Sequence, residues 1–335
     1  DKTLEFGRHC NNGLLIPYEA EIHRKGSSVL LLRDIYSPIV QLRAKKDTSC
    51  FIQTVPIPPR LFPSYQEQCS FILRDQEMTW KWDIPCFEPD ELNKLFDKKI
   101  KPKTTIDIGA TDLKEMLSKV LPCINPTDIR RPLTGMLCRV DEKRLRLTGT
   151  NGQKLFEVSR PHNGLSGLAM EVIVPSHTGS LLTMLLRKDT PIVKMGVSEE
   201  VVLFRFDGAS LIGKPITEEQ YPKYATMFKK AESSFRITIP ELRKTTANMS
   251  VVANPEDNHR MTISIEGDHV LFRNEKAKAE CLSLNTEGKM DIDINVLFLS
   301  SLARSIDGEE VEVRQCILDK GSSVITLHPE NGYQR

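Results

Sequence analysis

Five segments of the chain share one pattern, in which alternating apolar and polar positions give way to an apolar period of three to four residues. They are FIQTVPIPPRLF from Phe51, IDIGATDLKEMLSKVL from Ile106, MEVIVPSHTGSLLTMLL from Met170, FRITIPELRKTTANM from Phe235 and MDIDINVLFLSSLARSI from Met290. Alternation is typical of a half-buried strand, and Pro, Thr or Asn before the longer period favours the start of an amphipathic helix. Each segment therefore predicts a strand followed by a helix.

The segments begin roughly 55 to 65 residues apart, which leaves room for about three further strands after each helix. The runs MLCRVDEKRLRLTGTNGQKLFEV, VVLFRFDGASLIGKPI and MTISIEGDHVLFRNEKAKAECLSL alternate and contain turn residues, so they predict antiparallel hairpins. The repeating unit is therefore βαβββ. Residues 1–50 hold strand-like runs without a strand–helix opening, and we expect a sixth opening to precede Asp1 or to have degenerated.

Two successive units make a domain of about a hundred residues, which is a usual domain size. The charged, poorly apolar stretches KKIKPKTT (98–105) and FKKAESS (228–234) are typical of linkers. The pattern therefore predicts an α+β fold of three similar domains, at 1–102, 103–230 and 231–335, with mainly antiparallel sheets and paired helices. Three such domains in a row suggest an arc that a second copy could close into a ring.

The composition excludes some classes of protein but does not by itself indicate a function. The 335 residues are 39% hydrophobic and 27% charged with a formal net charge of +1, so the chain is not basic throughout, although a local basic face fits that total. No apolar run is long enough for a membrane span, and the eight cysteines show no C-x-x-C spacing. We expect a cytoplasmic protein with free thiols and no membrane association.

Catalytic chemistry has little support in the sequence. The chain lacks H-E-x-x-H, G-x-S-x-G, phosphate-loop and G-x-G-x-x-G motifs, and its seven histidines show no paired ligand spacing. We therefore expect no enzyme activity, no cofactor and no metal. Binding and assembly remain as the favoured classes of function.

The stretch LRLTGTNGQKLFEV (145–158) predicts a hairpin, because Asn-Gly supplies the positive φ of a tight turn. Together with RRPLTGMLCRVDEK (130–143), VIVPSHTGSLLTMLL (172–186) and VLFRFDGASLIGKPITEEQYPKY (202–224), it resembles the middle domain of the bacterial DNA polymerase III sliding clamp, the β subunit. Where that family reads Thr-Asp-Gly-His-Arg-Leu, this chain reads Thr-Asn-Gly-Gln-Lys-Leu. The resemblance is most specific over 104–228 and weakest before residue 100.

The resemblance implies a DNA-clamp fold and a head-to-tail homodimeric ring of six βαβββ units, with helices lining the inside around duplex DNA. It implies a non-catalytic processivity factor that tethers a DNA polymerase subunit, repair proteins and other proteins with a clamp-binding motif, and that a clamp loader opens. Partners would dock as short peptides in a cleft between the middle and last domains. The hairpin at 150–155 would form one wall of that cleft.

The cleft positions carried over from the family combine apolar residues for a peptide's anchors with polar residues that fix its register. They are Leu133, Thr150, Gly152, Gln153, Lys154, Leu155, Pro222, Met227 and Phe298, with Leu327, His328 and Pro329 matched to the family's closing strand. Taken singly, Leu133 and Leu155 are more often plain core residues. The run VITLHPENGYQR replaces the family's Met-Pro-Met-Arg-Leu strand, which leaves the accepted peptide motif open.

Lys and Arg on pore-facing helix sides would hold DNA phosphates without reading the bases. A helical projection of 111–122 places an apolar stripe on one side, with Lys119 opposite it and Lys114 at its margin. The expected DNA contacts are Lys114, Lys119, Arg187, Arg243, Lys244 and Arg304. Solvated helix faces carry such residues in many proteins, so the pattern alone does not decide.

Two further expectations concern assembly and a rival function. The strand EMTWKWDIP places Trp80 and Trp82 on one face, and we expect these residues in the dimer interface with Val251 and Val252 opposite, although ordinary packing suits tryptophan as well.

The rival is a clamp-like paralogue that acts as an interaction scaffold without encircling DNA. The changed C-terminus fits this rival, and so does Ser176-His177, which replaces a basic pair that the family carries beside DNA.

Overall fold

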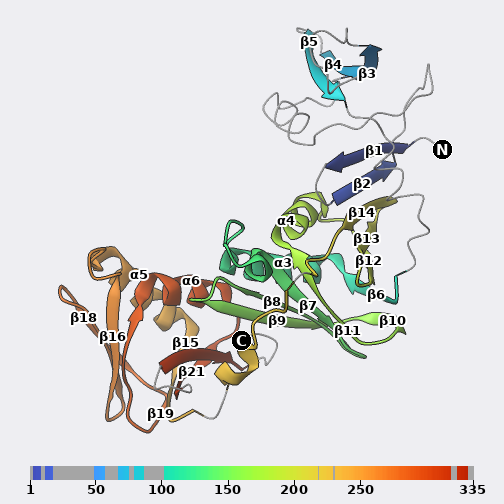
Figure 1. The fold of residues 1–335 in the computed structure, drawn as a ribbon. Coiled ribbons are helices and arrows are strands. Elements are labelled where there is room, and N and C mark those ends of the chain that lie inside the picture. The colour runs from blue at the N-terminus through green and yellow to red at the C-terminus, as the bar shows by residue number, and fades with distance from the viewer. Residues whose placement is uncertain are drawn as a thin grey trace. The chain divides into compact units, whose positions relative to one another are not determined.

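The computed structural model describes residues 3–8, 12–17, 49–56, 67–74, 79–86, 102–217, 219–228, 231–317 and 323–330. Its contacts divide the chain into two compact units (Figure 1). The first comprises Asp1–Thr111, Asn163–Met170 and Met184–Pro215, and the second comprises Asp112–His162, Glu171–Thr183 and Ile216–Arg335. Each unit is therefore assembled from separate stretches of sequence, and the three-domain division stays a prediction.

The first unit holds a seven-stranded sheet in the order β1-β2-β14-β13-β12-β6-β10 and a three-stranded sheet β3-β4-β5. Their bounds are Thr3–Arg8 (β1), Asn12–Pro17 (β2), Ser49–Pro56 (β3), Glu67–Arg74 (β4), Thr79–Cys86 (β5), Thr104–Gly109 (β6), Asn163–Gly167 (β10), Ile192–Val197 (β12), Val202–Phe206 (β13) and Ala209–Gly213 (β14). Neighbouring strands run antiparallel, as β6 does with β12 and β12 with β13.

Three four-stranded sheets, in the orders β11-β7-β8-β9, β19-β15-β21-β22 and β18-β17-β16-β20, lie mainly in the second unit. Their strands are Gly135–Val140 (β7), Arg144–Thr150 (β8), Leu155–Pro161 (β9), Met170–Pro175 (β11), Ser233–Thr238 (β15), Arg260–Glu266 (β16), His269–Arg273 (β17), Lys278–Leu282 (β18), Asn285–Glu287 (β19), Asp291–Asn295 (β20), Glu310–Ile317 (β21) and Ser323–Pro329 (β22). The antiparallel pairs β8–β9 and β16–β17 confirm the predicted hairpins.

Four α-helices follow directly on strands in the described part of the chain. They are Ala110–Val120 (α3), Ser176–Leu185 (α4), Ile239–Val252 (α5) and Val296–Ser305 (α6), and short 3-10 turns span Leu121–Cys123 (η1), Arg131–Thr134 (η2) and Tyr224–Phe228 (η3). Two of the residues predicted to begin helices act as N-caps. Thr238 accepts a hydrogen bond from the backbone N of Glu241, and Asn295 accepts from the backbone N of Leu297 and of Phe298. Four of the five predicted strand–helix openings are confirmed, and the helical part of the opening at Phe51 lies outside the described residues.

The predicted apolar stripe of α3 is buried, with Leu113, Met116, Leu117 and Val120 at most 1% exposed. Gly179 of α4 lies against this helix and β7, because an added Cβ would come within 2.7 Å of Met136 Cε. The α3 and α4 helices therefore pack closely over one sheet. With its mainly antiparallel sheets and strand-linked helices, the molecule has the predicted α+β fold.

Candidate functional site

The β8–β9 turn is closed by its own side chains. Thr150 Oγ1 accepts from Gly152 N at 3.0 Å and donates to Lys154 O at 2.8 Å, and Asn151 Oδ1 accepts from the backbone N of Gln153 and of Lys154, each at 3.0 Å. Gly152 has a φ of +87°, in the left-handed region that favours glycine. The sequence Thr-Asn-Gly therefore builds the tight turn that its composition predicts.

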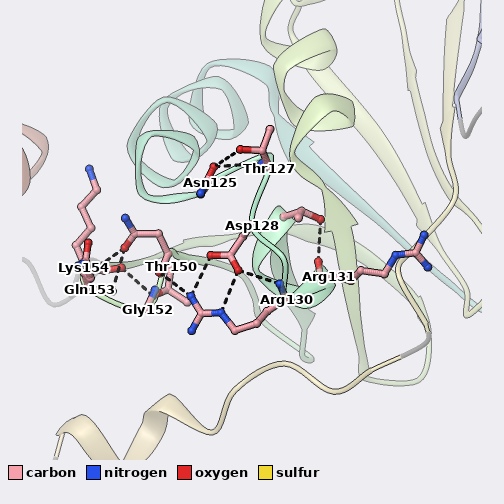
Figure 2. A network of polar contacts seen from close by, with 11 residues as sticks. Asn125, Thr127, Asp128, Arg130, Arg131, Thr150, Gly152, Gln153 and Lys154 are labelled. Atoms are coloured by element: carbon pink, nitrogen blue, oxygen red, sulfur yellow. Dashed lines mark hydrogen bonds and ion pairs between the residues drawn. The ribbon is translucent and has the colours of Figure 1, made fainter.

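A charged loop supports this turn from the side of η2, as Figure 2 shows. Arg130 donates from Nε to Asp128 Oδ1 and from Nη2 to Asp128 Oδ2, both at 3.0 Å, and Nη2 also donates to Asn151 O at 3.1 Å. The hydrogen bonds from Arg130 lower the pKa of the Asp128 carboxyl below its ordinary value. The carboxylate therefore stays ionised, and the pair joins the loop to the turn.

A cavity of about 390 Å³ lies beside the turn, within the second unit. Its lining residues come from the hairpin, η3, the end of β20, α6 with the residue that follows it, and β22: Thr150, Gly152, Gln153, Lys154, Leu155, Phe156, Phe228, Ile294, Asn295, Phe298, Leu299, Leu302, Ile306, Ser323, Val324, Ile325, Thr326 and Leu327. Among these described lining residues Lys154 alone carries a charge, and its Nζ is 3.4 Å from Ser301 Oγ. A mostly apolar lining with a few polar groups is typical of a ligand-binding pocket and can receive the side chains of a peptide.

Seven of the predicted cleft residues line this cavity, namely Thr150, Gly152, Gln153, Lys154, Leu155, Phe298 and Leu327. Leu133 does not, since it is 2% exposed and belongs to the core. Pro222 is exposed outside the lining, and Pro329 is buried at the end of β22, paired with Val311. His328 is not part of the lining, but its ring contacts Phe228 edge-on. The side chain of Met227 lies outside what the structure describes.

Most of the lining residues from α6 and β22 were not predicted from the sequence. Phe298 and Leu302 are four residues apart on α6 and half-buried, whereas Leu299 and Ala303 are nearly fully buried. This second apolar stripe could have been recognised in the sequence. One apolar face is enough to pack a helix on the core, so a second one indicates another contact surface. The β22 residues gave no comparable signal, since their place depends on pairing with β21.

An aromatic cluster holds η3 against the hairpin sheet. Tyr224 donates to Glu157 Oε2 at 2.6 Å and accepts from Arg139 Nη1 at 2.9 Å, and its ring contacts those of Tyr221 and Phe228 edge-on. Burial, with a smaller effect from Glu157, raises the pKa of Tyr224 to about 12. Its hydroxyl therefore stays protonated, and the cluster positions Phe228 at the cavity.

Lys119 does not have the exposed position predicted for a DNA contact. Its Nζ is 2.8 Å from Glu115 Oε1 and also contacts Asp307, and its side chain is only 8% exposed. The helical projection failed here because the partner carboxylate of Asp307 comes from the far end of the chain. Lys119 is a structural ion-pair residue.

Arg243 also makes internal contacts instead of facing solvent alone. It donates from Nε to Ala303 O at 2.9 Å and from Nη2 to Ile306 O at 2.5 Å, at the C-terminus of α6. These carbonyls lack partners within the helix, so a cation there is stabilising. Arg243 therefore contributes to ending α6, and its DNA role stays a prediction.

The remaining predicted cations differ in their surroundings. Lys244 and Arg304 are exposed, and Lys114 is half-buried with a polar contact of its own. Arg187 is 66% exposed and lies 3.6 Å from carboxylate oxygens of both Asp189 and Asp207. The DNA role of these four residues stays a prediction.

The residues expected in a dimer interface are only partly described. Val251 is 84% exposed and Val252 is half-buried at the end of α5. Trp80 and Trp82 lie on β5, but their side chains fall outside the described residues. Their interface role stays a prediction.

Two features are absent from the described residues. No group of three or more His, Cys, Asp or Glu side chains there could hold a metal ion. No helix in the same part of the chain is long and apolar enough to cross a membrane.

Comparisons with known proteins point to one family. A family profile described as "DNA polymerase III beta subunit, central domain" matches residues 107–223. A "Beta sliding clamp" of Helicobacter pylori is 23% identical over 238 residues, which are 67% of this chain and 59% of the relative. The chain thus spans less than two thirds of the length of that curated relative.

Solved structures show the same fold at low identity. A sliding clamp from Pseudomonas aeruginosa has a TM-score of 0.76 at 16% identity, covering 99% of this chain and 86% of that one. A putative DNA polymerase III beta subunit from Eubacterium rectale has a TM-score of 0.74 at 19% identity, covering 97% and 84%. The Thermotoga maritima beta subunit has a TM-score of 0.73 at 14% identity, covering 98% and 87%. The fold is therefore the sliding-clamp fold.

Proposed function

We propose that this chain, a divergent relative of the DNA polymerase III beta subunits with the sliding-clamp fold, is itself a DNA sliding clamp. It encircles duplex DNA as a head-to-tail homodimer of three-domain subunits, is opened by a clamp loader, and works in the cytoplasm at the nucleoid. It has no catalytic activity of its own. It tethers a DNA polymerase subunit and other proteins that carry a clamp-binding motif.

The observation that carries the proposal is the cavity beside the β8–β9 turn. Its hairpin wall, residues 150–156, falls inside the segment that matches the family's central domain, and the opposite wall comes from α6 and β22. A peptide with two or three apolar side chains would bury them against Leu155, Phe298 and Leu302, while Lys154 at the rim orients it. Extended segments gain most of their affinity from such few anchors.

The test is binding of a fluorescently labelled peptide from a DNA polymerase subunit, measured by anisotropy. Replacing Leu155 and Phe298 together by Ala should raise the dissociation constant by about 10- to 100-fold, because both line the cavity. Leu284→Ala is the matched control, since Leu284 is 52% exposed and does not line the cavity. Equal binding by the folded double variant and the parent would contradict the cleft.

The scaffold alternative is tested on DNA. Lys119 and Arg243, two of the expected DNA cations, make internal contacts, and this observation fits a clamp-like protein that does not encircle DNA. A clamp should stay on closed circular DNA after loading and leave it when the circle is cut. Peptide binding without such retention would favour the scaffold.

A further inference from the structure

Arg130 forms a three-way contact between a loop and the turn of the candidate cleft (Figure 2). Both carboxylate oxygens of Asp128 accept from its guanidinium, and Asp128 Oδ1 also accepts from the backbone N of Arg130 at 2.9 Å. The remaining bond of Nη2, to Asn151 O, reaches the turn itself at 3.1 Å. A planar guanidinium with several donors can hold a carboxylate and a carbonyl at once, which an ammonium group cannot do in the same geometry.

The guanidinium also lies directly against Gly152. A Cβ added to this glycine would come within 3.0 Å of both Nη1 and Nη2 of Arg130. The absence of a side chain therefore serves the turn's positive φ and also the close approach of Arg130. Arg130 itself does not line the cavity, whereas Gly152, Gln153 and Lys154 do.

We propose that Arg130, held by Asp128, is a positioning residue that fixes the Asn151-Gly152 turn in the conformation that receives a partner peptide. This inference rests on the proposed peptide-binding function. The turn's other bonds are internal, from the Thr150 and Asn151 side chains and from Asn151 N to Lys154 O, so Arg130 links it to a separate element. A wall that is ordered before binding spares the complex the entropy of ordering it.

The main alternative is that Arg130 attracts the peptide directly through its charge. The two hypotheses predict opposite changes in peptide affinity for Asp128→Asn. This substitution removes a negative charge, but it also releases Arg130 from its ion pair. Positioning predicts that Arg130→Ala and Asp128→Asn both weaken binding of the labelled polymerase peptide by about fivefold. Direct attraction predicts opposite effects of the two variants, and that result would overturn the proposal.

Two more variants sharpen the measurement. Arg130→Lys keeps the charge but loses the planar set of guanidinium donors, so we expect the same loss of peptide affinity as for Arg130→Ala. Parental binding by Arg130→Lys would overturn the role of the guanidinium geometry. Arg273→Ala is the matched control, because Arg273 forms an exposed pair with Glu266 between β17 and β16, away from the cavity. It should bind the peptide as the parent does.

A second readout requires no peptide. In the free protein, the amides of Gly152, Gln153 and Lys154 should exchange hydrogen about fivefold faster in Arg130→Ala and Asp128→Asn, and at the parental rate in Arg273→Ala. Unchanged exchange in the first two variants would overturn the positioning role. If the parent binds no polymerase peptide, the proposed function falls, and the exchange rates still decide whether Arg130 orders the turn.

Discussion

Lys119 joins α3 to a part of the chain that is synthesised much later. Arg160 continues the network, with Nη2 2.6 Å from Glu115 Oε1 and Nε 3.6 Å from Asp112 Oδ1. Two cations therefore lie between three carboxylates, including Asp307. A cation as buried as Lys119 is costly to remove, because its carboxylate partners are then left facing each other.

Replacing Lys119 by Met should lower the free energy of unfolding by about 1–3 kcal/mol, less than for a fully buried pair because Asp307 is 55% exposed. Urea denaturation measures this change. Lys103→Met is the control, since the Lys103–Glu199 pair spans 2.8 Å with both side chains more than half exposed, and it should change stability by at most about 0.5 kcal/mol. Equal losses in the two variants would contradict a special role for Lys119.

Cys138 is a thiol whose environment predicts a dependence on pH. Burial raises its pKa from 9.0 to about 12. Below pH 9 the thiol is neutral in both the folded and the unfolded chain, so its ionisation does not affect stability. Between pH 9 and about 12 only the unfolded chain ionises, so this thiol should lower stability as pH rises, by about 1.4 kcal/mol per pH unit.

The measurement is a comparison of the parent with Cys138→Ala. The parent should lose more stability than the variant between pH 8 and pH 10 in urea titrations. Iodoacetamide at pH 8 should leave Cys138 unmodified in the folded protein and modify it in urea. Parallel pH profiles for the two proteins would contradict the prediction.

At this scale the sequence predicts apolar positions better than charged ones. The stripe of α3 follows from helical periodicity alone, because burial of Leu113 or Met116 requires only that one face meets a core. The fate of Lys119 depends on a carboxylate 188 residues away. No local pattern contains that information.

The α6 helix is held at both ends by residues that do not belong to it. Asn295 caps its N-terminus through Leu297 and Phe298, and Arg243 of α5 binds the carbonyls of Ala303 and Ile306 at its C-terminus. The same helix presents Phe298 to the cavity. The capping of α6 therefore bears on one wall of the candidate cleft.

Arg243→Met should lower the free energy of unfolding by about 1–2 kcal/mol, because the hydrogen bonds to the helix-end carbonyls are lost. Thermal or urea denaturation measures the loss. Lys244→Met, at the exposed neighbouring position, should stay within about 0.5 kcal/mol of the parent. A similar effect of both substitutions would show that the carbonyl contacts contribute nothing.

Elements with local signals were predicted, and the cavity was predicted only in part. N-cap residues such as Thr238 and Asn295 locate the beginning of a helix to within a few residues, and Asn-Gly locates the hairpin turn. The β22 part of the lining depends on antiparallel pairing with β21, and Phe228 depends on ring contacts with Tyr224 and His328. Both depend on tertiary contacts, which the spacing of apolar residues along the sequence does not reveal.

The charge of the whole molecule is balanced, so any DNA contact must come from local exposed cations. Lys244 and Arg304 are the exposed members of the predicted set on α5 and α6. Lys119 and Arg243 are committed to internal contacts. Within the predicted set on these two helices, Lys244 and Arg304 are therefore the positions at which to test the predicted DNA face.

Reversing charge with Lys244→Glu and Arg304→Glu together should weaken association with duplex DNA and lower the salt slope by about two units, since each phosphate contact contributes about 0.9. Binding to linear duplexes of different sequence at several salt concentrations measures the slope, and sequence preference should not change. Lys276→Glu with Lys289→Glu is the control of equal charge, on exposed loop positions that belong to neither helix. Identical slopes in both double variants would contradict a DNA face on α5 and α6.

The lining of the cavity also sets an order of events during synthesis. The hairpin residues near Leu155 leave the ribosome first, and roughly 170 residues must follow before Leu327 completes the opposite wall. At about 5–20 residues per second, this interval lasts on the order of 10–30 s. During that time the nascent chain has only one wall of the cavity, so under the proposed function a partner peptide would be captured only by a nearly finished subunit.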